Sequence, residues 1–311
     1  MISTDLNLAI NLLNSGEIIA IPTETVYGLA GNALNENALI KIFKAKKRPY
    51  LNPLITHIGR ISQLSNLCKD IPNEAWVLID VFWPGPLTLL LPKINSIPDL
   101  LTSGLEHLAV RMPSHPMALQ LLKSIDYPLA APSANPYKYV SPTSAQHVAD
   151  QLENIIPLIL DGGDCDIGLE STIIGFENNE VIVHRLGGIT IEEIERTLKK
   201  SVILFETNDS HKYPGQNKKH YSPNKRITLI PFGSDLPRIH EEDTLISWLP
   251  SSMSTDSISA DGTDISGASR LFSLLRDLDK KETRKIYIEQ APNIGLGEAI
   301  NDRLKRAAYP S

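Results

Sequence analysis

Short apolar runs alternate with amphipathic segments of helical period along roughly the first 200 residues of the chain. We expect strands at 17–21, 53–58, 87–91, 108–112, 129–131, 156–160, 172–174 and 181–184. We expect helices at 3–15, 36–46, 73–82, 116–124, 143–152 and 191–199. Apolar strands interleaved with helices in this way predict an α/β domain.

Two of these helices carry recognisable boundary signals. Ser3 or Thr4 is the expected cap of the first helix, and Gly16 suits its C-terminal exit. Asn35 is the expected cap of the helix at 36–46, and Pro49 ends that segment.

The composition changes at Glu206. From there to Arg226 the chain is polar and poor in aliphatic side chains, which predicts a linker between two domains. In the remainder we expect strands at 227–231, 244–248 and 285–289, helices at 268–278 and 298–308, and a mobile loop at 251–266. The predicted domains are therefore 1–205 and 227–311, joined by 206–226.

The segment Gly295-Leu296-Gly297 follows an expected strand and opens an expected helix, as a dinucleotide-binding loop would. Ile300 stands where the third small residue of that motif belongs. We therefore do not expect a dinucleotide at this position.

Composition limits the kinds of protein to which this chain can belong. The chain has 311 residues and a net charge of −6, which counts against a dedicated binder of duplex nucleic acid. Cys68 and Cys165 are the only cysteines and form no Cys-x-x-Cys pair, so neither a zinc ribbon nor a disulfide scaffold is expected. No apolar run is long enough for a membrane helix, and the N-terminus lacks a signal-peptide pattern. We expect a cytoplasmic protein.

The polar loop Pro22-Thr23-Glu24-Thr25 and a run of cations mark the first candidate site. Five cations lie within eight residues from Lys41 to Arg48. Their helical spacing prevents all of them from pointing into one site, so some face solvent. Lys46 and Arg48, at the exit of the helix, are the pair best placed to bind phosphate.

Three further positions pose a choice between a structural and a functional role. Arg111 and Arg185 end buried strands, where an arginine needs an anion that a protein carboxylate could also supply. His57 also ends an apolar strand and, taken alone, would more often be a core histidine. Ser133-Ala134-Asn135 forms a polar turn that local hydrogen bonds could explain equally well.

Several known motifs are absent. The acidic segment 161–166 lacks the spacing of an EF-hand, so a glycine-rich turn is expected there. The chain contains no Walker loop and no His-Glu-x-x-His motif. A phosphate-binding site would therefore not be a P-loop.

Eight short strings stand out along the chain, at 22–29, 46–49, 52–55, 83–88, 110–113, 131–135, 170–173 and 185–188. In sequence, order and spacing they resemble those of the YrdC-type threonylcarbamoyl-AMP synthases in their long, two-domain form. The Pro214-Gly215 and His220-Tyr221 pairs resemble the family's linker, which lies over the active site, so the resemblance implies a lid. It also implies a YrdC-like twisted open mixed sheet with helices and a smaller Rossmann-like α/β C-terminal domain.

The resemblance assigns roles to individual positions. As catalytic residues it implies Lys46 and Arg48. For threonine it implies Thr25, His57, Arg111, Ala131 and Ser171. For ATP it implies Arg48, Asn52, His107, Ser133, Asn135, Ser141, Arg185 and Tyr221.

The activity implied is synthesis of L-threonylcarbamoyl-AMP from L-threonine, bicarbonate or CO2, and ATP, with release of pyrophosphate. Mg2+ would arrive with ATP, no metal site of the protein's own is expected, and a tRNA threonylcarbamoyl transferase complex would receive the product. One alternative is an RNA-binding or regulatory module without catalysis, which the acidic charge disfavours. Another is the carbamoyl-transfer domain of hydrogenase maturation proteins, whose Cys-rich zinc region this chain lacks.

Overall fold

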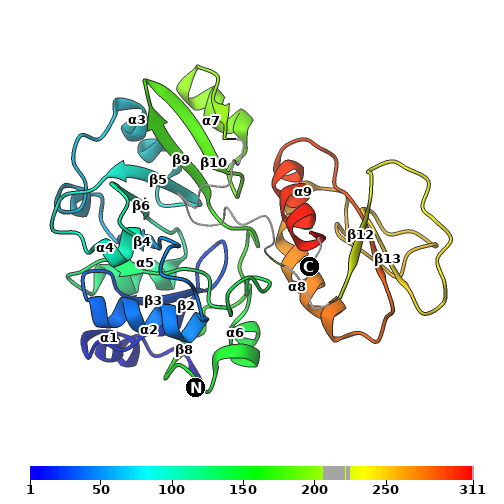
Figure 1. Cartoon of the computed structure of the whole chain (residues 1–311), viewed down its shortest axis with the longest axis horizontal. Helices are drawn as coiled ribbons and strands as arrows, with labels where there is room; N and C mark the ends of the chain where they lie inside the picture. The colour runs from blue at the N-terminus through cyan, green and yellow to red at the C-terminus, as the bar shows by residue number, and fades with distance from the viewer. Residues whose placement is uncertain (206–220, 222–224, 310–311) are drawn as a thin grey trace.

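The structure is a computed structural model that describes residues 1–205, 221 and 225–309. Most of the predicted linker at 206–226 lies outside the described residues, so its lid role stays a prediction. The described residues form two sheets, one before and one after this segment in the sequence (Figure 1).

The larger sheet has eleven strands in the order β1-β8-β2-β3-β7-β4-β6-β5-β9-β10-β11. Their bounds are β1 Ile2–Ser3, β2 Ile19–Ile21, β3 Gly28–Asn32, β4 Ile55–His57, β5 Leu87–Pro92, β6 His107–Arg111, β7 Leu129–Ala130, β8 Ile159–Leu160, β9 Thr172–Glu177, β10 Glu180–Arg185 and β11 Ile203–Leu204. Parallel pairs such as β4–β6 and antiparallel pairs such as β5–β6 occur side by side. The sheet is therefore mixed.

Helices surround this sheet and close its core. They are α1 Leu6–Asn14, α2 Glu36–Lys46, α3 Asn73–Phe82, α4 Asp99–Thr102, α5 Pro116–Lys123, α6 Ala145–Leu152 and α7 Ile191–Leu198, with a 3-10 turn at Ile61–Asn66. Asn35 caps α2 as predicted, because its side chain accepts from the backbone N–H groups of Asn37 and Ala38. The predicted cap of the first helix is wrong, since Asp5 rather than Ser3 or Thr4 accepts from the Leu8 N–H.

Strand β3 is an element that the sequence pattern did not predict. Its residues, Gly-Leu-Ala-Gly-Asn, include no β-branched or aromatic side chain, so local propensity for a strand is low. Pairing supplies what propensity lacks, because β3 runs antiparallel to β2 on one side and to β7 on the other. Gly31 suits this position because a Cβ there would crowd Ile18 and Ile42.

The smaller sheet contains four parallel strands in the order β12-β15-β13-β14. The bounds are β12 Ile227–Ile230, β13 Thr244–Ser247, β14 Asp256–Ser257, β15 Ile286–Glu289, α8 Asp264–Lys280 and α9 Leu296–Ala307. The predicted mobile loop at 251–266 in fact holds β14 and the first turn of α8. In Figure 1, α8 and α9 lie between this sheet and the larger domain.

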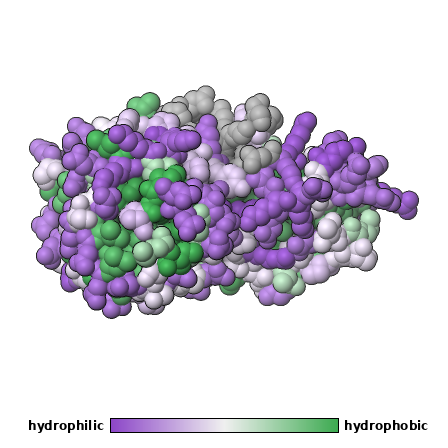
Figure 2. Space-filling view, turned by 90° about the horizontal axis from the view of Figure 1, so that it is seen from below, coloured by the Kyte–Doolittle hydropathy of each residue, from purple (hydrophilic) through white to green (hydrophobic). Residues whose placement is uncertain are grey.

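The contact between the two domains includes apolar side chains. Val26, Val140 and Leu169 of the larger domain belong to the same buried cluster as Leu271 of α8 and Ile300 of α9. Seen from below in Figure 2, hydrophilic side chains cover most of the smaller domain, and hydrophobic ones gather on part of the larger. Among the described residues no helix is long and apolar enough to cross a membrane.

The predicted fold class is confirmed: a twisted mixed α/β sheet with helices is joined to a smaller parallel α/β domain.

Candidate functional site

One open cavity, with about 620 Å³ of empty space, collects nine of the predicted site residues. They are Thr25, Arg48, His57, Arg111, Ala131, Ser133, Ser171, Arg185 and Tyr221. They come from eight separate stretches of the chain, so tertiary structure makes them neighbours.

The order of strands in the large sheet produces this convergence. His57 ends β4 and Arg111 ends β6, and the two are paired in register. On the side of β6 away from β4, Arg111 pairs in register with Thr88 of β5. Thr88 in turn pairs with Ile173 of β9, which follows Ser171 closely in the chain. Because side chains alternate along a strand, Ile55, Ala109, Leu90 and Ile173 share this face and form a small apolar cluster beneath the polar groups.

Arg111 is held at one end of the cavity by the loop after β2. Its Nη1 donates to Thr25 Oγ1 at 2.8 Å, and its Nε donates to the Gly85 carbonyl at 3.2 Å. Its Nη2 lies 2.5 Å from Glu24 Oε1, and both side chains are buried. The protein carboxylate that was the alternative partner for Arg111 therefore exists, and it also keeps the guanidinium in place.

Neither oxygen of Glu24 makes a hydrogen bond of good geometry with the described residues, although the ion pair is short. Two opposite buried charges at this separation attract strongly in any orientation. Glu24 is thus an electrostatic partner of Arg111.

Arg185 occupies the other side of the cavity, at the end of β10. Its Nε and Nη2 both donate to the Ser171 carbonyl, at 3.0 and 2.9 Å, and Nη2 also donates to Ser171 Oγ. Ser171 Oγ shares a further hydrogen bond of 2.7 Å with Thr88 Oγ1. Backbone and hydroxyl oxygens thus fix the guanidinium without neutralising it.

Arg48 is anchored in the same way. Its Nε and Nη2 donate to the carbonyls of Asn52 and Pro53, and its guanidinium lies over the Tyr137 ring. Burial lowers the pKa of Arg48 and that of Arg185 to about 10, so both remain charged at neutral pH. No carboxylate within the described part of the chain forms an ion pair with either.

Lys46 is expected to contact phosphate, but in the structure it does not line the cavity. Lys46 is buried at the end of α2, and its Nζ donates to the carbonyls of Ser133 and Asn135. It therefore pins the polar turn after β7, which holds Ser133 at the cavity wall. Burial, together with Arg48, lowers the pKa of Lys46.

Four other predicted residues do not line the cavity. Asn135 donates to the carbonyls of Pro136 and Tyr139, so it closes the turn, and Asn52 donates to the Tyr137 hydroxyl. Ser141 is buried behind the cavity wall, and its hydroxyl donates to the carboxylate of Glu170. His107 begins β6 while Arg111 ends it, and it lines a separate small cavity beside His184.

His57 lies at the cavity wall, not in the general core. Burial and the neighbouring Arg111 lower its pKa to about 3. The ring is therefore neutral at physiological pH, and its Nδ1 lies 3.3 Å from the Ile55 carbonyl.

Tyr221 is the one residue of the predicted linker that reaches the cavity in the described structure. Its ring stacks on Phe272 of α8 and lies beneath the guanidinium of Arg303 of α9. Its φ is +60°, a left-handed backbone conformation that a tyrosine seldom adopts. Burial raises its pKa to about 12.

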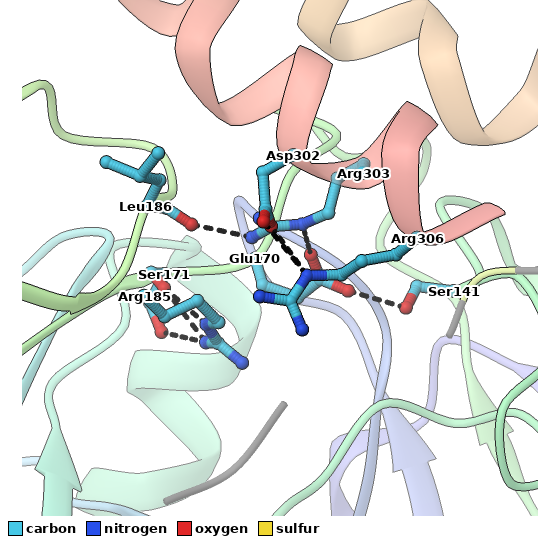
Figure 3. Close-up of polar contacts among 8 residues, drawn as sticks. All are labelled: Ser141, Glu170, Ser171, Arg185, Leu186, Asp302, Arg303 and Arg306. Atoms are coloured by element: carbon cyan, nitrogen blue, oxygen red, sulfur yellow. Dashed lines mark hydrogen bonds and ion pairs between the residues drawn. The ribbon is translucent and has the colours of Figure 1, made fainter. Parts of the chain in front are cut away.

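Two residues of the site were missed by sequence reasoning. Glu170 lines the cavity and is bound by Arg303 of the C-terminal domain (Figure 3). Glu170 opens the family-like string at 170–173, which was the available signal. Nothing in that string indicated that its side chain meets Arg303.

The described residues contain no group of three or more acidic, His or Cys side chains that could hold a metal ion. Glu170, which lines the cavity, is paired with Arg303, and Glu24, which lies behind it, is paired with the cavity residue Arg111. Three arginines and a set of hydroxyls therefore favour an anionic, hydroxyl-bearing ligand.

Comparison with known proteins agrees with this chemistry. The Sua5_yciO_yrdC family model, described as "Telomere recombination", matches residues 11–187. The model described as "Threonylcarbamoyl-AMP synthase, C-terminal domain" matches residues 189–309.

Individual relatives match over nearly the whole chain. The chain is 39% identical to a threonylcarbamoyl-AMP synthase of Pyrococcus abyssi, covering 97% of this chain and 94% of that protein. It is 38% identical to a Bacillus subtilis protein of the same name, covering 96% and 91%. The crystal structure of P. abyssi Sua5 complexed with L-threonine superimposes with a TM-score of 0.89 at 38% identity, over 97% and 94% of the two chains. The chain therefore belongs to the two-domain Sua5 family of threonylcarbamoyl-AMP synthases.

Proposed function

We propose that the chain synthesises L-threonylcarbamoyl-AMP and pyrophosphate from L-threonine, bicarbonate or CO2, and ATP. It would act as a nucleotidyltransferase, because an adenylyl group moves from ATP to a carbamate oxygen. The observation that carries this proposal is the convergence of three arginines, buried Arg111 and Arg185 and half-buried Arg48, on one hydroxyl-lined cavity, in a chain of this family.

The end of the cavity around Arg111 suits threonine. The guanidinium there would bind the substrate carboxylate, and Thr25 and neutral His57 offer further polar contacts. Ala131 also lines the cavity. The P. abyssi relative was crystallised with L-threonine, which supports this assignment.

The other side of the cavity suits ATP. Arg48 and Arg185 present cations that no carboxylate among the described residues neutralises, and Ser133 and Tyr221 complete the wall. Lys46, Asn52, Asn135 and Ser141 would act indirectly, by holding the segments that carry these groups. We leave His107 out of the proposed site.

Mg2+ would enter as part of the substrate MgATP. The carboxylates nearest the cavity are engaged with arginines, so the protein would bind the nucleotide's phosphates and leave several waters on the ion.

The reaction needs no covalent enzyme intermediate. The threonine amine takes up bicarbonate to give a carbamate and water, and a carbamate oxygen then attacks the α-phosphorus of ATP. The bond from that phosphorus to the bridging oxygen breaks, and pyrophosphate leaves. Arg48 and Arg185 would stabilise the negative charge that moves onto pyrophosphate, so alignment and electrostatics suffice.

The product would serve as activated donor for threonylcarbamoylation of tRNA adenosine by a downstream transferase complex in the cytoplasm. Stable binding of tRNA by this chain itself is not part of the proposal, since the net charge is −6.

Incubation of the purified chain with ATP, Mg2+, L-threonine and 13C-bicarbonate tests the proposal. Mass spectrometry should show a threonylcarbamoyl adenylate that carries the label, with an equal amount of pyrophosphate. Omission of threonine or ATP should abolish it. An adenylate without the label, or no adenylate beside tight ATP binding, would refute the synthesis, and a salt-dependent RNA titration would then examine the non-catalytic alternative.

A further inference from the structure

Two buried arginines of the C-terminal domain cross into the larger domain. Arg276 of α8 donates to the carbonyls of Val140, Ser141 and His147, and Arg303 of α9 reaches Glu170 and the Leu186 carbonyl. Arg303 is fully buried. It is also the closer of the two to the cavity, because Glu170 lines that cavity.

All three guanidinium nitrogens of Arg303 are used. Nε donates to Glu170 Oε2 at 3.0 Å, Nη1 to Asp302 Oδ2 at 2.7 Å and Nη2 to the Leu186 carbonyl at 2.7 Å. Glu170 directly precedes Ser171, and Leu186 directly follows Arg185. One side chain thus ties together the two segments that carry the Arg185–Ser171 contact (Figure 3).

The second oxygen of Glu170 extends this connection. Glu170 Oε1 accepts from Ser141 Oγ at 2.7 Å, while the Ser141 carbonyl accepts from Arg276. The Arg303 guanidinium also lies 5.4 Å from the centre of the Tyr221 ring, which forms part of the cavity wall. Ser141, Glu170 and Tyr221 therefore all depend on contacts with α8 or α9.

A buried ion pair by itself is weak evidence of a role beyond folding, because desolvation offsets its attraction. The position of Glu170 supplies the stronger argument. Its carboxylate faces a cavity that suits an anion, and it lies close enough to Arg185 to raise the pKa of that guanidinium against the effect of burial. Without Arg303, Glu170 would repel the phosphates and compete with them for Arg185.

We propose that Arg303 is a positioning residue for the nucleotide: it neutralises and orients Glu170, and so keeps Arg185 available to an anionic ligand. This inference rests on the proposed function, since it assigns ATP to the Arg185 side of the cavity. The C-terminal domain would thereby complete the nucleotide site without contacting the nucleotide through Arg303.

Equilibrium binding of ATP and of L-threonine to the full chain, measured separately by calorimetry, tests the inference without turnover. We expect Arg303→Met to raise the ATP dissociation constant at least about tenfold and to leave that of threonine within about threefold. Adding Glu170→Gln to this variant should restore most of the ATP affinity, because the competing charge is then gone. A purely structural role would not produce that recovery.

Lys280→Ala is the matched control. Lys280 of α8 forms an exposed interdomain ion pair with Asp150, at 3.0 Å, away from the cavity. We expect this variant to bind both ligands as the wild-type chain does.

ATP binding equal to wild type in Arg303→Met would overturn the inference. So would equal weakening of both ligands without recovery by Glu170→Gln. If Arg303→Met does not fold, Arg303→Lys replaces it, because lysine keeps a charge at Glu170 but lacks the fork that also reaches Leu186. Wild-type ATP affinity in Arg303→Lys would then overturn the orienting role.

The two proposals fail in different ways. A wild-type chain that binds both ligands but makes no product would refute the synthesis and leave the binding test intact. A wild-type chain that binds no ATP would overturn this inference as well.

Discussion

At the scale of single residues, the partners of an arginine decide what it can still bind. Arg48 and Arg185 are held by carbonyl and hydroxyl oxygens, which orient a guanidinium but do not neutralise it. Arg303 is paired with the carboxylates of Glu170 and Asp302, which balance its positive charge. Buried cations of the first kind are the ones to expect in an anion site.

Arg48→Ala should lower kcat/KM for ATP by on the order of 2–5 kcal/mol in transition-state stabilisation, the range for truncated buried charge contacts. Steady-state kinetics of product formation measures the effect. Lys44→Ala is the control, since Lys44 is an exposed cation of α2, the helix that precedes Arg48. Turnover near the wild-type value in Arg48→Ala would remove Arg48 from the catalytic residues.

Arg111→Lys should raise the KM for threonine about tenfold or more while the KM for ATP changes little. Lysine keeps a charge beside Glu24 but cannot also hold Thr25 and offer a planar fork to the substrate carboxylate. Arg196→Lys, on the exposed face of α7, is the conservative control. An unchanged threonine KM would mean that the carboxylate binds elsewhere.

At the scale of elements, the site depends on short connections that other segments of the chain hold in place. The end of α2 holds the turn after β7 through Lys46, and the segment after β10 packs directly against the start of β9. These contacts hold in place the segments that carry the cavity walls.

Lys46→Met should destabilise the chain by about 1–3 kcal/mol, because the carbonyl of Asn135 then loses a buried donor. Urea unfolding measures the change, with exposed Lys44→Met as control. The ATP KM should rise with it, as the Ser133 wall loosens. Wild-type stability combined with a large loss of kcat would instead favour the direct catalytic role that the resemblance implies.

Gly187→Ala should destabilise the chain by about 1–3 kcal/mol or more, because the new methyl group would meet backbone that cannot move aside. A Cβ at this glycine would fall on the Glu170 carbonyl oxygen and on the backbone of Ser171 and Thr172. Thermal unfolding with and without ATP should show a lower midpoint and a smaller shift on ATP addition. A midpoint equal to that of wild type would show that this connection tolerates displacement.

At the scale of the whole molecule, two buried histidines couple folding to pH. Burial lowers the pKa of His57 to about 3 and that of His184 to about 4, below the ordinary value of 6.5. Below pH 6.5 the unfolded chain therefore binds protons that the folded chain excludes, so stability falls as pH falls. For His57 the loss extends to about pH 3 and amounts to a few kcal/mol in order of magnitude.

His57→Asn should flatten this acid dependence. Urea midpoints between pH 7 and pH 4 should decline less steeply in the variant than in the wild-type chain. His240→Asn is the control, because His240 is exposed and has no comparable burial. If stability declines with pH as steeply in His57→Asn as in the wild-type chain, folding does not lower the pKa of His57.

Much of the fold could be predicted because its signals are local. The helices at 36–46 and 73–82 were predicted at their observed bounds, since apolar period, an Asn cap and flanking prolines lie within a few residues of one another. Arg48, Arg111 and Arg185 stand out in the chain as cations that follow or end apolar segments, but it was the family resemblance that assigned them to the site. For the helices, neighbouring residues carry the whole cause.

Tertiary structure alone decided the features whose cause lies far away in the chain. Strand β3 forms despite low propensity because β2 and β7 pair with it on both sides. Lys46 turns to carbonyls 87 and 89 positions away, His107 stands at the far end of β6 from Arg111, and Arg303 meets Glu170 across 133 positions. The sequence by itself determined which side chains could bind an anion, because charge and period are properties of nearby residues. Which of them reach the cavity was decided only when sheet order and the contact between domains brought distant segments together, because no short window of sequence contains both partners.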